Sequence, residues 1–90
     1  MQTDLVDRAR RGDREAFGVL AGGAVDRLYA TARLILRDTE LAEDATQDAL
    51  VRAWRDLPSL RDAERFDAWL YRLVVNACAD VGRHRRRWRA

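Results

Sequence analysis

Apolar residues recur at helical spacing along most of this 90-residue chain. One stripe at intervals of three and four comprises Ala42, Ala45, Thr46, Ala49, Leu50, Ala53, Trp54 and Leu57. A second stripe, with the same periodicity, comprises Val25, Leu28, Tyr29, Ala32, Ile35 and Leu36. Such spacing places each set on one face of a helix, and no segment alternates with the period of a strand. The pattern predicts an all-α chain.

Capping and helix-breaking residues divide this pattern into elements. We expect a first helix over residues 3–11 with Thr3 or Asp4 as its cap, and a short helix over residues 13–21 that Gly22 and Gly23 stop or loosen. Further helices are expected over 24–37, over 39–57 after a cap at Asp38 or Thr39, and over 63–82 after a cap at Asp62. The inner stripe expected for the last helix is Phe66, Trp69, Leu70, Leu73, Ala77 and Val81.

These elements predict a compact bundle of three principal helices plus a short helix, with antiparallel neighbours joined by short loops. Ninety residues suffice for a single domain, 1–90, with its core at about 3–82 and a basic tail at 83–90. Gly82 lowers helix stability by roughly 1 kcal/mol relative to alanine, so we expect the tail to fray.

The net charge of +2 hides an asymmetry along the chain. Residues 1–70 hold 11 arginines against 14 acids, whereas residues 71–90 hold 6 arginines against Asp80 alone. No apolar run is long enough to cross a membrane or act as a signal peptide, which predicts a cytoplasmic protein with no membrane partner. Cys78 is the only cysteine and His84 the only histidine, which argues against an internal disulfide and a structural zinc site. We also expect no cofactor. The nearby apolar residues Val74 and Val81 predict that Cys78 is buried and unreactive.

A catalytic function is not supported by the residues available, because the chain has no lysine, no glycine-rich phosphate loop and no nucleophile paired with a base. Glu43, Asp44 and Asp48 diverge around one helix and are better explained as solvated surface acids than as a metal or acid–base cluster. The sequence therefore predicts a protein that is not an enzyme.

A polar face lies on the 39–57 helix opposite its apolar stripe. It comprises Asp44, Gln47, Asp48, Val51, Arg52 and Arg55, which recur at helical spacing. An ordinary charged surface with an Asp48–Arg52 pair and a docking surface for a partner helix are equally good explanations of this pattern alone.

The ordered set Ala42-Glu43-Asp44, Gln47, Trp54, then Trp69-Leu70-Tyr71-Arg72-Leu73 and Asn76 resembles region 2 of bacterial extracytoplasmic-function (ECF) sigma factors. The resemblance runs from about Gly12 to the terminal arginines. It implies that the polar face of the 39–57 helix docks on the β′ clamp helices of core RNA polymerase. It also implies recognition of the non-template single strand of the minus-ten promoter element, and an anti-sigma factor is a further partner that the resemblance leaves open.

Candidate DNA contacts lie on the last helix and on the loop before it. Arg72, Asn76 and Arg83 share one face, and Arg85, Arg86, Arg87 and Arg89 add positive charge, although a solubilising tail remains an alternative. The resemblance implies that the loop at 60–65 captures an unstacked base, which makes Arg61, Asp62 and Glu64 candidates. The family commonly has small hydroxyl residues near 64 and 65, and acids there oppose DNA binding.

Aromatic side chains can serve as stacking platforms for bases. Trp54 and Trp69 fall on apolar stripes and are predicted to be core residues, whereas Tyr71 lies off its stripe and stays open. Together, the resemblance predicts a transcription initiation domain that binds polymerase and helps to melt the minus-ten element. The alternatives are a sigma-like module that keeps the polymerase face without reading promoters and, more remotely, a generic helical DNA-binding protein.

Overall fold

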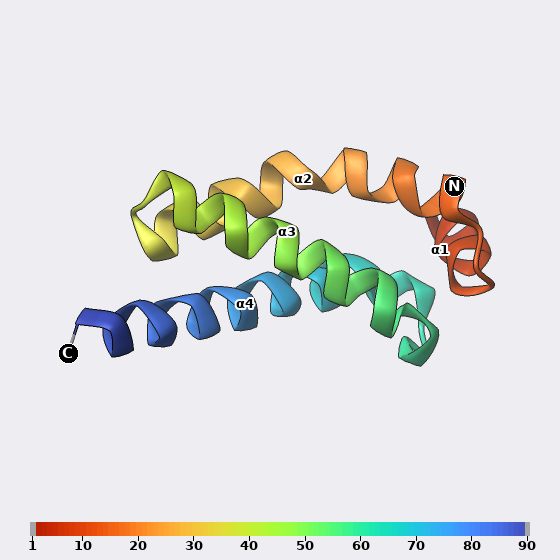
Figure 1. Ribbon diagram of the computed structural model, residues 1–90. Coiled ribbons are helices and arrows are strands. Elements are labelled where there is room, and N and C mark those ends of the chain that lie inside the picture. Colours follow the sequence, from red (N-terminus) through yellow and green to blue (C-terminus); the bar gives the residue numbers. More distant parts are fainter. Residues whose placement is uncertain (1, 90) are drawn as a thin grey trace.

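Four α-helices and two short 3₁₀ turns make up the chain in the computed structural model, which describes the backbone of residues 2–89 and the side chains of residues 2–85. The helices are α1 (Gln2–Arg10), α2 (Arg14–Leu36), α3 (Thr39–Asp56) and α4 (Phe66–Arg89), with η1 (Leu57–Ser59) and η2 (Ala63–Arg65) between the last two. Figure 1 shows the three long helices side by side, with α3 in the middle and α1 at the end where α2 begins. The predicted bundle of three principal helices plus a short one is confirmed.

Two tight turns set the directions of the first three helices. Gly12 adopts φ +99°, a conformation that side chains disfavour, and Asp13 then caps α2 by accepting a hydrogen bond from the amide of Ala16 at 3.1 Å. At the other end of α2, Arg37 is left-handed with φ 54° and donates its amide to the carbonyl of Arg33. Asp38 then accepts from the amide of Leu41 at 2.9 Å and is the cap of α3.

Helix α2 runs without interruption, so the predicted break at Gly22 and Gly23 is wrong. Both glycines are exposed, and the space around each is open. The opposite face of α2 carries an unbroken buried stripe at four-residue intervals, formed by Ala16, Leu20, Ala24, Leu28 and Ala32. Packing of this stripe outweighs a helix penalty of about 1 kcal/mol per glycine.

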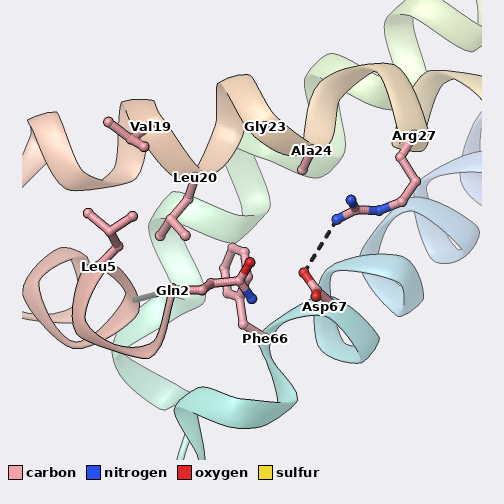
Figure 2. Close-up of a pocket in the computed structure, with 9 residues that line it drawn as sticks. All are labelled: Gln2, Leu5, Val19, Leu20, Gly23, Ala24, Arg27, Phe66 and Asp67. Atoms are coloured by element: carbon pink, nitrogen blue, oxygen red, sulfur yellow. Dashed lines mark hydrogen bonds and ion pairs between the residues drawn. The ribbon is translucent and has the colours of Figure 1, made fainter.

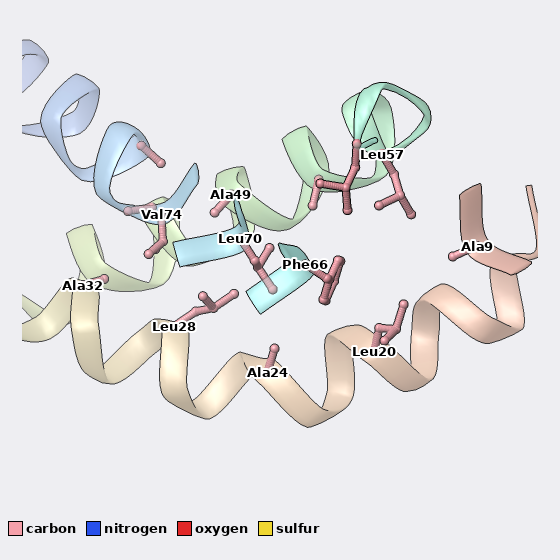
Figure 3. Close-up of a cluster of buried hydrophobic side chains, with 14 of the residues drawn as sticks. Ala9, Leu20, Ala24, Leu28, Ala32, Ala49, Leu57, Phe66, Leu70 and Val74 are labelled. Carbon is pink, nitrogen blue, oxygen red and sulfur yellow. The ribbon is translucent and has the colours of Figure 1, made fainter. Parts of the chain in front are cut away.

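The core lies where α2, α3 and α4 face one another, and Figure 3 shows Leu28 and Ala24 of α2 pointing toward Phe66 and Leu70 of α4. Helix α3 contributes mainly small side chains to this core, namely Ala42, Ala45, Thr46, Ala49 and Ala53. Alanine lets helix axes approach closely, so α3 packs against both α2 and α4. The hydroxyl of Thr46 donates to the carbonyl of Ala42 at 2.7 Å and is satisfied within the helix.

Helix α4 begins later and ends later than the sequence predicts. Asp62 caps η2 by accepting from the amide of Glu64 at 3.0 Å, and α4 follows directly from Phe66. Gly82 does not end the helix, which continues through the arginine run to Arg89 (Figure 1). The side chains of Arg86, Arg87 and Arg89 lie outside the described residues.

Several apolar residues that the stripes place inside are exposed. Trp54 is 36% exposed at the rim of the core, where its ring lies 5.1 Å from that of Phe17, so the prediction of a core tryptophan is wrong there. Val25 and Ile35 are exposed as well, because only the centre of the α2 stripe meets the other helices. Trp69 is half-buried and packs against the core beside Phe66.

Candidate functional site

The outer face of α3 holds the six residues of the predicted polar face. Asp44, Gln47, Val51 and Arg55 are exposed, with Val51 at 59%, while Asp48 and Arg52 are half-buried. Arg55 is paired with its neighbour Asp56 through two hydrogen bonds of 2.9 Å. The exposed valine amid polar groups provides a small apolar centre on which a partner helix can pack.

Arg52 does not project toward solvent with the rest of this face, because its guanidinium turns to α4. Its Nη2 lies 2.8 Å from Oδ2 of Asp48 and 2.6 Å from Oδ2 of Asp80, and its side chain is 23% exposed. The hydrogen bond from Arg52 lowers the pKa of Asp80, and the same bond raises the pKa of Arg52. Arg52 therefore joins α3 to α4 as well as carrying charge near the surface.

Two open grooves flank the outer face of α3. One, of about 480 Å³, lies against α2 and is lined by Val25, Asp26, Tyr29, Glu43, Thr46, Gln47 and Leu50. The other, of about 370 Å³, lies against α4 and is lined by Leu41, Asp44, Asp80, Val81, His84 and Arg85. Gln47 borders the groove against α2, and Asp44 borders the groove against α4. The outer face of α3 therefore continues into apolar recesses on both sides.

The candidate DNA face lies on α4. Arg72, Asn76 and Arg83 are exposed along one side of the helix, and Tyr71 beside them is 56% exposed. Tyr71 is therefore better placed than the half-buried Trp69 to offer a ring to a base. Arg85 is partly engaged elsewhere, since its Nη1 lies 3.6 Å from Oδ2 of Asp38.

The loop before α4 exposes three predicted residues, Arg61, Asp62 and Glu64, whereas Leu60 is buried and anchors the loop. Asp62 also has a structural role, because its carboxylate caps η2 and lies 3.8 Å from the guanidinium of Arg65. Two exposed acids thus stand at the entrance to the candidate DNA face, as the sequence indicates.

A pocket of about 290 Å³ opens between α1, α2 and the start of α4. Figure 2 shows Phe66 and Leu20 at its base and the Arg27–Asp67 ion pair, 3.3 Å long, at one edge. This ion pair ties α2 to the first turn of α4. The sequence does not single out Arg27 or Asp67, since residues 40 positions apart give no helical periodicity that links them.

The sigma-70 region 2 family matches residues 24–90 of the chain. The chain belongs to this family. It is 45% identical over 69 residues to the ECF RNA polymerase sigma factor SigM of Mycobacterium tuberculosis, a match that covers 77% of this chain and 35% of SigM. It is 36% identical over 74 residues to the ECF RNA polymerase sigma-E factor of Escherichia coli, covering 80% of this chain and 37% of that protein.

A solved structure agrees with these relatives. The complex formed by an engineered region 2 of sigmaE with GTAAAA superposes with a TM-score of 0.84 at 30% identity, covering 96% of this chain and 92% of that chain. The resemblance to region 2 of ECF sigma factors is therefore confirmed. The chain spans well under half the length of the curated relatives described here. Across residues 2–89, no helix is both long and apolar enough to span a bilayer.

Asp80 lies between the two candidate faces, and the sequence pattern does not place it there. It contacts Arg52 of α3 and Arg83 of α4. As the single acid among residues 71–90 it was visible in the sequence, but its partner on α3 lies 28 residues earlier. Only the packing of α3 against α4 joins the two residues.

Proposed function

We propose that this domain docks on the β′ clamp helices of core RNA polymerase through α3 and reads the minus-ten promoter element through α4. The observation that carries the proposal is the separation of two exposed faces on adjacent helices. Asp44, Gln47 and Val51 form a mixed polar and apolar face on α3, and Arg72, Asn76 and Arg83 form a basic one on α4. The role is non-catalytic, since the polymerase carries out the chemistry, and it belongs in the cytoplasm.

The α3 face suits a helical partner. Val51 provides an apolar centre, Asp44 and Asp48 surround it with negative charge, and Gln47 borders the groove against α2. Basic residues on the clamp helices would pair with the two carboxylates beside this centre, and the pairs would be desolvated in the docked complex. The groove that Gln47 borders leaves room for a second helix of the partner to pack.

The α4 face suits a single strand of DNA. Arg72 and Arg83 supply charge for phosphates, Asn76 supplies a hydrogen-bonding amide, and the exposed ring of Tyr71 can stack on a base. The loop residues Arg61, Asp62 and Glu64 would contact one unstacked base, whose capture offsets the few kcal/mol needed to open a base pair. The related region 2 of sigmaE, which is in complex with GTAAAA, supports this assignment.

A protein-interaction module without promoter reading is the second candidate. It is favoured by the exposed carboxylates of Asp62 and Glu64, which repel a DNA backbone at the loop. The α3 face would then be the functional surface, and the same face could serve an anti-sigma factor.

Binding of core polymerase and of single-stranded DNA distinguishes these functions. Polymerase capture on the immobilised domain is measured alone, with a single-stranded GTAAAA probe and with a strand of scrambled sequence, and a ternary complex should form preferentially with GTAAAA. Polymerase binding without any preference among DNA sequences supports the protein-interaction module, and the absence of polymerase binding contradicts both.

A further inference from the structure

A continuous series of ion pairs links the two proposed faces. Nη2 of Arg52 contacts Asp48 at 2.8 Å and Asp80 at 2.6 Å, and the other carboxylate oxygen of Asp80 contacts the guanidinium of Arg83. The two inner residues each take part in two ion pairs. Arg52 contacts both Asp48 and Asp80, and Asp80 contacts both Arg52 and Arg83. Asp48 lies on the α3 face and Arg83 on the α4 face, so the series runs from one to the other.

The position of Asp80 opposes DNA binding by Arg83. A carboxylate paired with a guanidinium competes with phosphate for the same N–H donors, and its charge repels the strand. Asp80 is 42% exposed and Arg83 60% exposed, so their pair is weak enough to exchange partners. Arg85, the next described arginine, is near Asp38 instead and does not replace Arg83 beside Asp80.

We propose that Asp80 is a positioning residue that controls how freely Arg83 binds DNA, according to what occupies Asp48. The proposal rests on the proposed function of the two faces. When a basic group of the polymerase pairs with Asp48, Arg52 keeps Asp80 as its remaining carboxylate partner. Asp80 is drawn toward Arg52, and Arg83 is released to a phosphate. Docking on α3 thereby strengthens DNA binding on α4 without a change of fold.

The substitution Asp48→Asn imitates neutralisation of Asp48 by the polymerase. Binding of a fluorescent single-stranded GTAAAA probe to the 90-residue chain is measured over a salt series, with Glu40→Gln as the matched control. Glu40 is exposed in the first turn of the same helix, carries the same charge and is outside the series of ion pairs. We expect Asp48→Asn to bind about two- to fivefold more tightly than the control, which corresponds to an exposed ion pair. The slope of log affinity against log salt concentration should become steeper by about 0.7 for the added phosphate contact.

Double substitutions separate this coupling from a general loss of negative charge. The effect of Asp48→Asn should vanish in the Arg83→Ala background and in the Asp80→Asn background, and should persist in Asp80→Glu, which keeps the carboxylate. The Arg83→Ala arm leaves the tie between α3 and α4 intact, so it decides the matter even if Asp80→Asn unfolds. Equal effects of Asp48→Asn and Glu40→Gln, or an effect that survives Arg83→Ala, would overturn the proposal.

A measurement without DNA keeps this proposal distinct from the proposed function. The rotation of the Arg83 guanidinium, followed by NMR, should be slower in the parent than in Asp48→Asn. A parent that does not bind the probe contradicts promoter reading, whereas the Arg83 signal still decides the coupling. Identical rotation in both proteins overturns it.

Discussion

The guanidinium of Arg52 on α3 donates a hydrogen bond of 2.6 Å to the carboxylate of Asp80 on α4. This contact holds together the two helices that carry the candidate polymerase and DNA faces. It also explains why Arg52, which the sequence places on an outward face, is among the least exposed members of that face.

Acid should weaken the fold through Asp80 and two similar carboxylates. The pKa of Asp80 is lowered by Arg52, that of Asp56 by Arg55, and that of Asp13 by the amide of Ala16. A depressed folded-state pKa contributes stability that is present above the unfolded value, near 3.8, and is lost as pH falls through the folded one. Denaturant unfolding of the parent at pH 7 and below pH 4 should show this loss. Asp80→Asn should show less of it, and an equal loss in both would contradict the assignment.

Alanine at the two α2 glycines should stabilise the protein. Gly22 and Gly23 are helical and exposed with open space around them, so each replacement should add about 0.5 to 1 kcal/mol to the free energy of unfolding. In a domain of this size that raises Tm by roughly 4 to 8 °C per kcal/mol. Gly12→Ala is the control and should destabilise, because φ +99° strains a side chain. A lower Tm for both α2 variants would mean that the helix bends there.

Trp54→Ala should be a mild substitution and Phe66→Ala a severe one. Trp54 is 36% exposed and packs on Phe17 at the rim, so we expect a loss of about 1 to 2 kcal/mol. Phe66 is 2% exposed at the centre of the core, and its truncation should cost about 3 to 5 kcal/mol. Thermal melts measured by circular dichroism compare the two, and equal losses would refute the rim position of Trp54.

Phosphate and base contacts should respond differently to salt. Arg72→Ala should weaken binding of all single strands alike and flatten the salt slope by about 0.7, and Arg83→Ala should do the same in the Asp48→Asn background, where Asp80 no longer holds Arg83. Arg61→Ala should instead change which base is preferred at one position, with little change of slope. Arg14→Ala, on α2, controls for the loss of a charge alone. If it flattens the slope as much as Arg72→Ala, the α4 face is not the DNA site.

The sequence predicts the bundle because helical periodicity reports burial directly, as in the Ala42, Ala45 and Ala49 stripe of α3. It fails at Gly22 and Gly23, where local propensity disagrees with packing on the opposite helix face. It fails again at Trp54 and Val25, which lie beside the buried residues Ala53 and Ala24, because periodicity gives a direction around a helix but not how wide a strip of its surface the neighbouring helices cover. The sequence predicts the residues of a candidate face when they all lie on one helix, because their spacing shows that they share a side. It does not predict the part played by Asp80, which depends on contact between two helices.

Capture of core RNA polymerase tests the central claim most directly. Asp44→Ala and Gln47→Ala remove exposed side chains of the α3 face, and Glu15→Ala removes an exposed acid from the first turn of α2 as a control. The account predicts that Asp44→Ala, which breaks a charge pair at the interface, weakens polymerase binding by about 2 to 5 kcal/mol. Gln47→Ala should weaken it less, the control should bind like the parent, and helical circular dichroism should be unchanged throughout. Parental affinity in both Asp44→Ala and Gln47→Ala would contradict docking through α3.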